Sequence, residues 1–253
     1  MQNRNGTLFF DKKPYISSFA SVVGKKEGEG PLREQFDTIV HDSYFGQDTF
    51  EKAETEMMRT TVSLALQKSG LSLEKIDLAF CGDLLNQCVA SSFAMSGFGI
   101  PYAGIYGACS TMALGLMMSA MAVESGAAER TVCAASSHYC TAERQYRFPL
   151  EYGSQRPPTA QWTVTGCGAC IIDGAPDLTI PKPYIHSACP GIITDYAVTD
   201  QNNMGAAMAP ADVKIGTKNS FKPSKLMTFY MKKGIGSIPI ILLNRFCVDR
   251  IIN

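Results

Sequence analysis

Forty consecutive residues, 84–123, contain no Asp, Glu, Lys or Arg. Within them, residues 112–121 are apolar or small on every face of a helix. A helix that is apolar all round lies either at the centre of a large domain or in a membrane. A membrane span needs about 20 continuous apolar residues, and here Asn86, Pro101 and several glycines interrupt the stretch. We therefore expect a central buried helix, and a chain of 253 residues is long enough to enclose one.

The residues on either side of this helix predict a strand–helix–strand unit. A strand is expected at residues 102–106, a tight turn at 107–108, the helix at 110–124 and a second strand at 131–136. Cys109 then lies where a strand passes into a buried helix. The first N–H groups of a helix lack intrahelical partners and carry partial positive charge. A thiolate at Cys109, or an anion beside it, is therefore favoured.

The rest of the pattern alternates strands with helices. Further strands are expected at residues 15–23, 76–81 and 163–173, with a strand pair within 185–199. An amphipathic helix is expected at 48–68, with Asp48 as its N-cap and Gly70 after its end, and another helix should begin near 84–86. This alternation indicates an α/β layered fold with a largely parallel sheet flanked by helices.

Charge and cysteine usage exclude several classes of protein. The 23 basic and 23 acidic residues give no net charge, so nothing predicts a nucleic-acid partner. The first six residues are polar, and no apolar signal-peptide core follows. Nine cysteines, an odd number scattered through apolar runs, indicate reduced, buried thiols. Cys167 and Cys170 form a lone CxxC in a glycine-rich strand, where we expect no zinc site because a second ligand pair is missing.

Three polar side chains follow predicted parallel strands at their carboxyl ends: Asp83, Cys109 and His138. Ligands of open α/β sheets bind at that edge, and a cysteine near a histidine is the minimum requirement for an activated thiol. The alternative is that Cys109 only fills the core and that His138 is a hydrogen-bonded structural residue. His41 and His186 are weaker candidates because neither ends a clear strand.

Two segments depart from the α/β pattern. Residues 139–162 are polar and irregular, which is typical of a long functional loop. Residues 213–253 hold 8 basic and 1 acidic side chains, net +7, whereas residues 1–212 hold 15 and 22, net −7. This shift predicts a boundary near residue 212. The tail has three interpretations: an out-of-frame translation, a basic and apolar anchor on a membrane surface, or a native final strand.

Several motifs together resemble a known family. Residues 107–111, followed by an alanine-rich helix, resemble the nucleophile segment of the thiolase and ketoacyl-synthase superfamily. Longer motifs resemble one family more narrowly, that of stage V sporulation protein AD. These motifs are residues 30–32, 82–87, 106–111, 135–138, 141–147, 151–153, 163–166 and 204–211. The resemblance covers residues 4–212, so it implies a thiolase-like N-terminal half in residues 1–212 and an apparently truncated second half.

The resemblance implies binding rather than an established enzyme activity. Members of this family are implicated in binding dipicolinic acid, with or without calcium, and in its uptake into the forespore alongside membrane proteins of the same operon. We therefore expect a peripheral protein of the spore inner membrane, without a signal peptide, a transmembrane segment or a cofactor. Because thiolase-like folds commonly dimerise, a homodimer is a further expectation by analogy.

The implied ligand suggests a role for each candidate residue. Dipicolinate is a planar dianion at neutral pH, so the helix N-terminus at Cys109, with His138 and Arg144, is a reasonable cradle for it. Asp83 is expected to contact a chelated calcium ion, because hard carboxylate oxygens suit that ion.

Two alternatives remain open. The first is an acyltransferase or condensing enzyme of the thiolase type that uses Cys109. That enzyme needs an activating histidine and an acyl-thioester tunnel, which the family's second half would supply, so we expect no such activity from this chain and assign no firm catalytic residue. The second is a scaffold for membrane partners with a relict pocket.

Overall fold

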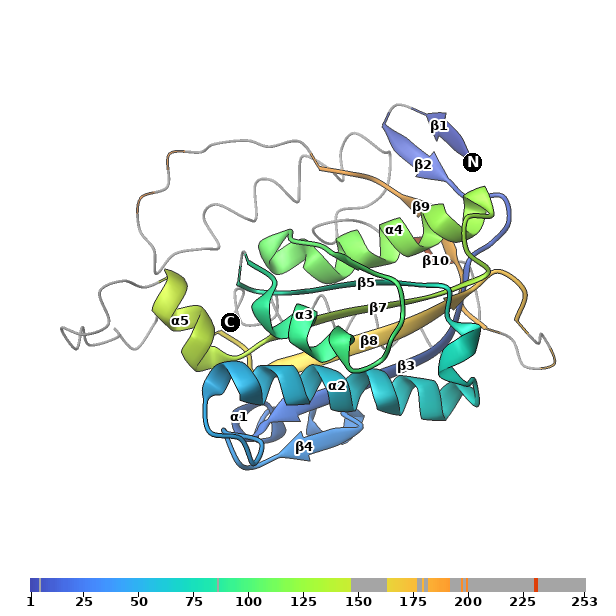
Figure 1. The fold of residues 1–253 in the computed structure, drawn as a ribbon. Helices are drawn as coiled ribbons and strands as arrows, with labels where there is room; N and C mark the ends of the chain where they lie inside the picture. Colours follow the sequence, from blue (N-terminus) through green and yellow to red (C-terminus); the bar gives the residue numbers. More distant parts are fainter. Residues whose placement is uncertain are drawn as a thin grey trace.

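The computed structural model describes residues 1–4, 6–85, 87–146, 163–176, 179, 182–191, 197, 199 and 230–231. These residues form a six-stranded central sheet with helices on both faces (Figure 1). A second, four-stranded sheet contains strands from near both ends of the chain: β1 (Gln2–Arg4), β2 (Thr7–Phe9), β9 (Ile185–Ala188) and β10 (Tyr230–Met231).

The central sheet is mixed, and most of its pairings are parallel. Its strand order is β4-β3-β8-β7-β5-β6. The strands are β3 (Tyr15–Gly24), β4 (Thr38–Val40), β5 (Leu78–Asp83), β6 (Tyr102–Gly104), β7 (Arg130–Ser137) and β8 (Gly166–Asp173). β3 is parallel to β4, and β5 is parallel to both β6 and β7, whereas β8 is antiparallel to β3 and β7. The predicted α/β class with a mostly parallel sheet is confirmed.

Helices cover both faces of this sheet. α2 (Phe50–Ser69) and α3 (Val89–Ser96) lie on one face and α4 (Thr111–Ser125) on the other, as Figure 1 shows. α5 (Tyr139–Tyr146) follows β7 at one end of the sheet. The short helices are α1 (Lys25–Gly28) and the 3-10 turns η1 (Arg33–Gln35), η2 (Leu73–Lys75) and η3 (Ala108–Ser110). Each face of the sheet therefore has its own apolar core.

α4 is the predicted central helix. It packs on β5, β7 and β8, and most of its side chains are buried. Gly115 allows this close approach, because a Cβ there would lie 3.2 Å from Cys133 Cβ and 3.3 Å from the carbonyl oxygen of Phe80. Residues 108–125 also meet the length and composition of a membrane span, but the core helix of a globular domain meets the same criteria.

The residues at the two ends of α2 (Phe50–Ser69) show how local sequence determines where a helix begins and ends. Thr49 is the N-cap, since its hydroxyl accepts a hydrogen bond from the backbone N–H of Lys52 at 3.2 Å. Asp48, the predicted N-cap, instead pairs with the Lys52 ammonium at 3.0 Å, so the predicted boundary was wrong by one residue. The predicted stop at Gly70 is confirmed by its left-handed backbone, with φ +70°.

Two sets of polar contacts, each built on carboxylates, connect elements of the fold. Neither set involves Cys109. Glu124, near the end of α4, accepts hydrogen bonds from the backbone N–H groups of Asp11 and Lys12 at 3.1 and 2.9 Å. The amino group of Met1 lies 2.6 Å from the same carboxylate. Glu124 thereby ties α4 to the segment that precedes β3.

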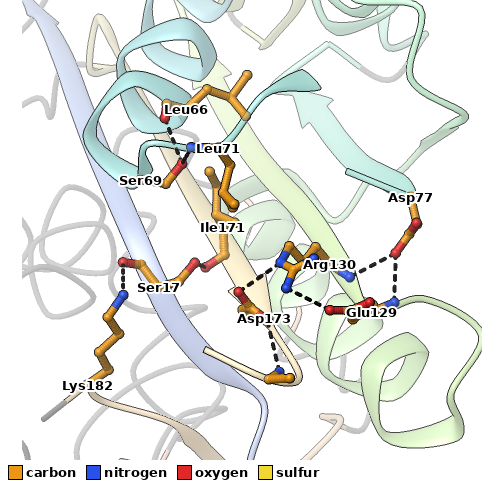
Figure 2. A network of polar contacts seen from close by, with 11 residues as sticks. Ser17, Leu66, Ser69, Leu71, Asp77, Glu129, Arg130, Ile171, Asp173 and Lys182 are labelled. Carbon is orange, nitrogen blue, oxygen red and sulfur yellow. Dashed lines mark hydrogen bonds and ion pairs between the residues drawn. The ribbon is translucent and has the colours of Figure 1, made fainter. Parts of the chain in front are cut away.

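The second set of contacts lies where β7 begins and β8 ends (Figure 2). Arg130 Nε donates to Asp173 Oδ2 at 3.0 Å, and Arg130 Nη2 lies 2.6 Å from Glu129 Oε1. Asp77 Oδ2 accepts from the backbone N–H groups of Glu129 and Arg130, at 2.7 and 2.9 Å. This network fixes the amino ends of β5 and β7 against β8.

Some predicted segments differ from the structure. α3 begins at Val89 rather than near residues 84–86, because the chain first turns around the Asp83 side chain. The first eight residues of the expected irregular segment 139–162 form α5, and residues 147–162 lie outside the described part. Within 185–199 the structure describes one strand, β9, and within the tail 213–253 it describes β10, which pairs with β9.

Candidate functional site

The carboxyl ends of three adjacent strands form the candidate site. β7, β5 and β6 are neighbours and run parallel, so their carboxyl ends lie at one edge of the sheet. Asp83 ends β5 and is the register partner of Ser136 on β7. His138 follows β7 directly, and Cys109 lies in η3, after β6. The structure thus places all three predicted residues at the same edge.

Cys109 lies in a tightly bonded corner. The preceding residue, Ala108, has φ +45°, in the left-handed region that non-glycine residues rarely adopt. Ser110 Oγ donates to the carbonyl of Gly107 at 2.7 Å, and Thr111 Oγ1 donates to the carbonyl of Ala108 at 2.7 Å while accepting from Gly107 N–H at 3.1 Å. These bonds keep the half-buried Cys109 at the junction between strand and helix.

The end of β5 lies in direct contact with this corner. A Cβ on Gly82 would lie 2.0 Å from the carbonyl oxygen of Ile105 and 2.7 Å from Thr111 Cγ2. Such distances are too short for any side chain, so only glycine permits the observed approach. The corner that carries Cys109 is therefore positioned by the backbone of the neighbouring strand.

Helix α4 begins at the same corner. Its N-cap, Ser110, makes no side-chain cap hydrogen bond, and its first turn contains no acidic residue. The partial positive charge of the helix end is therefore not offset by side chains of α4 itself. The N–H groups of Ser110 and Thr111 already donate to the carbonyls of Gly107 and Ala108 in the turn η3, so an anion at this corner would be favoured chiefly by the positive end of the helix dipole.

His138 is a buried, hydrogen-bonded histidine. It is 1% exposed, and its ring stacks on Phe50 with centroids 5.0 Å apart. Nδ1 accepts from the backbone N–H of Cys140 at 3.2 Å, so Nε2 carries the proton and donates to the carbonyl of Ser43 at 2.8 Å. Both ring nitrogens therefore have backbone partners in the neutral tautomer, as in the structural alternative considered from the sequence.

Asp83 is also fully buried, and its carboxylate accepts hydrogen bonds from α3 and from the turn that precedes this helix. Oδ2 accepts from the backbone N–H and the hydroxyl of Ser91, at 2.8 and 2.7 Å, and Oδ1 accepts from Leu85 N–H at 3.1 Å. Burial raises the pKa of Asp83, and these hydrogen bonds partly oppose the shift. In this structure Asp83 positions α3, and calcium contact at Asp83 stays a prediction.

Arg144 belongs to α5, but its side chain lies outside the described residues. The helix begins at the same sheet edge, because Thr141 Oγ1 lies 2.9 Å from the carbonyl oxygen of His138 and Ala142 N–H donates to that carbonyl at 3.0 Å. The backbone of α5 therefore starts at the candidate site, and contact of Arg144 with a ligand stays a prediction.

The sequence reasoning missed Glu54. This residue of α2 is 0% exposed and contacts Ser136 and Thr141 at the same edge. Burial, together with the nearby Asp83, raises the pKa of Glu54 to about 7, although the two hydroxyls oppose the shift. The available signal was spacing, because residue 54 lies four residues after Phe50 and thus on the buried stripe.

Among the described cysteines, no two form a disulfide with one another. Burial raises the pKa of Cys81, and it raises the pKa of Cys167 to about 12. Cys167 and Cys170 belong to the cores on opposite faces of the sheet, so the CxxC does not point both thiols at one ion. Among the described residues, no group of three or more His, Cys, Asp or Glu side chains could hold a metal ion.

Comparison with known proteins identifies the family. The sequence model of the stage V sporulation protein AD (SpoVAD) family matches residues 4–228. Stage V sporulation protein AD of Bacillus subtilis is 41% identical over 205 residues, or 81% of this chain. The chain belongs to the stage V sporulation protein AD family. The match continues beyond residue 212, where the motifs placed its end, so the first part of the tail also resembles the family.

The chain spans 60% of the length of the Bacillus subtilis relative. Among solved structures, a variant of OleA from Xanthomonas campestris is 14% identical, with a TM-score of 0.55 over 85% of this chain and 74% of that one. The 3-oxoacyl-[acyl-carrier-protein] synthase III of Aquifex aeolicus is 14% identical, with a TM-score of 0.52 over 83% and 73%. At this identity the likenesses concern the fold alone, and they confirm that it is thiolase-like.

Proposed function

We propose that this chain binds dipicolinate, alone or as its calcium chelate, and supports its uptake into the forespore together with membrane proteins of the same operon. Membership of the stage V sporulation protein AD family supports this assignment. The observation that carries it is the positive N-terminal end of α4, which begins two residues after Cys109 and has neither a side-chain cap nor an acidic residue in its first turn. In this proposal the chain acts at the inner membrane of the forespore as a peripheral protein.

The chemistry of the corner suits a small planar dianion. One carboxylate lies at the positive N-terminal end of α4, where it is held by the helix dipole and by N–H groups beyond Thr111, whose own N–H donates to the Ala108 carbonyl. Arg144 supplies the balancing positive charge from α5, since a guanidinium binds a carboxylate with two hydrogen bonds. His138 positions the start of α5, and Asp83 positions α3, because their polar atoms are occupied by backbone and Ser91. If the ligand carries calcium, its own carboxylates and ring nitrogen would chelate the ion, and Asp83 is the carboxylate expected to contact it.

Calorimetric titration of the whole chain tests the proposal. We expect saturable binding of dipicolinate and at least about tenfold weaker binding by Cys109→Ala or His138→Ala, which corresponds to about 1.4 kcal/mol. Cys189→Ala, which changes a half-buried cysteine after β9, is the matched control. Benzene-1,3-dicarboxylate is the control ligand, because it keeps both carboxylates but lacks the ring nitrogen that helps to chelate calcium. Unchanged affinity in both site variants would refute the proposed site.

An acyltransferase of the thiolase type is the second candidate. The observation in its favour is the half-buried Cys109 at a strand-to-helix corner, after a residue with positive φ. Against it, His138 Nδ1 already accepts from Cys140 N–H, so that lone pair is not available to take a proton from the thiol.

Alkylation of Cys109 by iodoacetamide at neutral pH separates the two candidates. Fast, selective modification together with acyl-CoA hydrolysis favours the enzyme. Slow modification that dipicolinate slows further favours the binding protein. If Cys109→Ala rescues a deletion strain completely and binds no dipicolinate, the chain serves as a scaffold with a relict pocket.

A further inference from the structure

Glu54 is a fully buried carboxyl group at the junction of three elements. It belongs to α2, and its Oε1 accepts a hydrogen bond from Ser136 Oγ, near the end of β7, at 2.9 Å. Its Oε2 lies 2.9 Å from Thr141 Oγ1 in the first turn of α5. Within the described residues, no cation is among the groups that act on Glu54. An ionised carboxylate here would carry a large desolvation penalty.

Thr141 shows which form of Glu54 fits this junction. Thr141 Oγ1 lies 2.9 Å from Glu54 Oε2 and also 2.9 Å from the carbonyl oxygen of His138. A hydroxyl has one hydrogen, so it can fully donate to only one of these oxygens. If Glu54 is ionised, the two oxygens compete for that hydrogen. If Glu54 is protonated, Glu54 donates to Thr141, and Thr141 donates to His138.

We propose that Glu54 is a neutral carboxylic acid in the folded chain and that its proton links α2 to the first turn of α5 through Thr141. When Glu54 loses this proton, the Thr141 hydroxyl turns towards the carboxylate, and the bond from Thr141 to the His138 carbonyl is lost. The start of α5 is therefore weaker when Glu54 is ionised. This inference involves no ligand and stands apart from the proposed function.

The surroundings of Glu54 favour its neutral form. The titratable groups that face it or its hydrogen-bond chain are Asp83 of β5, Glu51 of α2 itself, Cys167 of β8 and His138 at the start of α5. β3 and α3, which also pack on α2, contain no Asp, Glu, Lys, Arg or His. α5 also carries Glu143 and Arg144, whose side chains lie outside the described residues. Burial and the Asp83 charge together raise the pKa of Glu54 to about 7.

Glu54→Gln is the variant that tests the proton. Its amide can donate to Thr141 and accept from Ser136, so the hydrogen-bond chain remains but no longer titrates. The raised pKa gives the folded state more bound protons than the unfolded state, so stability falls as pH rises. We expect the unfolding constant of the wild-type chain, relative to that of Glu54→Gln, to rise about tenfold per pH unit between the ordinary pKa of 4.5 and about 7.

Urea unfolding across this pH range measures the effect. Glu56→Gln is the matched control, because Glu56 lies on the same helix in a partly exposed ion pair with Arg59. We expect the unfolding constant of the wild type, divided by that of Glu54→Gln, to rise with pH. The same ratio taken against Glu56→Gln should stay nearly constant. Equal slopes for the two comparisons would overturn the proposal.

Infrared spectroscopy of the folded chain gives an independent readout. A protonated, buried carboxyl group has a C=O band separate from that of carboxylates. We expect the wild type to show more of this band than Glu54→Gln at about pH 6, and the difference to vanish at about pH 9; the difference separates Glu54 from Asp83, whose pKa burial also raises. Thr141→Ser should keep the band and the pH profile, whereas Thr141→Val should weaken the fold even at low pH. A folded wild type without the band contradicts the proposal, even if other variants fail to fold.

Discussion

At the scale of single residues, Ser110 offers the sharpest test of the corner beside Cys109. We predict that Ser110→Asp changes the free energy of unfolding by less than about 1 kcal/mol, because the favourable charge at the positive end of α4 is offset by loss of the hydrogen bond that Ser110 Oγ donates to the Gly107 carbonyl at 2.7 Å. The added carboxylate repels a dianion at the positive end of α4 proposed for dipicolinate, so ligand binding should weaken at least about tenfold. Urea unfolding and calorimetric titration measure the two effects.

Ser110→Ala is the control for this prediction. It removes the hydrogen bond from Ser110 Oγ to the Gly107 carbonyl without adding charge. If Ser110→Asp binds dipicolinate as well as Ser110→Ala does, the helix N-terminus is not the anion site.

The roles of individual site residues could be predicted only in part. The edge of the sheet was predictable, because Asp83, Cys109 and His138 each follow a strand. Their bonds were not, because the carbonyl that His138 contacts belongs to Ser43, 95 residues away in the sequence. Glu54 was missed because an acidic residue on a helix is usually solvated, and only the tertiary contacts with β7 and α5 show that it is buried.

At the scale of elements, Gly82 controls how β5 meets the Cys109 corner. We predict that Gly82→Ala destabilises the chain by about 3 kcal/mol or more, because its Cβ would overlap the Ile105 backbone and the strand would have to move. Gly97→Ala is the control, since the nearest atom there belongs to the flexible side chain of Arg59 at 3.3 Å. Thermal unfolding distinguishes them, and equal losses would mean that β5 does not position the corner.

At the opposite edge of the sheet, the polar network around Arg130 should stabilise the pairing of β7 with β8. We predict that Arg130→Met lowers the free energy of unfolding by about 1.5–3 kcal/mol, the range for hydrogen bonds to charged groups. Arg33→Met removes an exposed ion pair with Glu34 and should change stability by less than about 1 kcal/mol. Urea unfolding measures both, and a similar small effect for Arg130 would show that the network in Figure 2 contributes little.

Most elements could be predicted from periodicity and end signals. The strand at 15–23, the helix before Gly70 and the apolar helix before Gly126 all appear within one or two residues of their expected bounds. The start of α3 was misplaced because the turn around Asp83 depends on hydrogen bonds from Ser91, which has no periodic signature. The helix α5 was missed because its sequence is polar and its first turn is fixed by contacts with α2.

At the scale of the whole molecule, the carboxyl groups of Glu54 and Glu124 make the free energy of unfolding depend on pH in opposite directions. Burial tends to raise the pKa of Glu124, but hydrogen bonds from Met1, Lys12 and Asp11 outweigh it and lower the pKa. A lowered pKa contributes stability above the ordinary value of 4.5 that is lost as pH falls. We therefore predict that Glu124→Gln lowers stability near neutral pH and has a smaller effect in acid, the reverse of Glu54→Gln. Urea midpoints across the pH range measure this, and parallel profiles for both variants would contradict it.

β8 joins the two parts of the central sheet, because it lies between β3 and β7. During synthesis β3 and β4 leave the ribosome first and β5, β6 and β7 follow, but the two groups cannot pair until β8 has emerged. Pairings between strands so distant in sequence form slowly, and open strand edges can associate with other chains. Between the release of β7 and the arrival of β8, the nascent chain therefore carries two groups of strands with open edges, and a translational pause or a proteolytic cut in that interval would prolong this state.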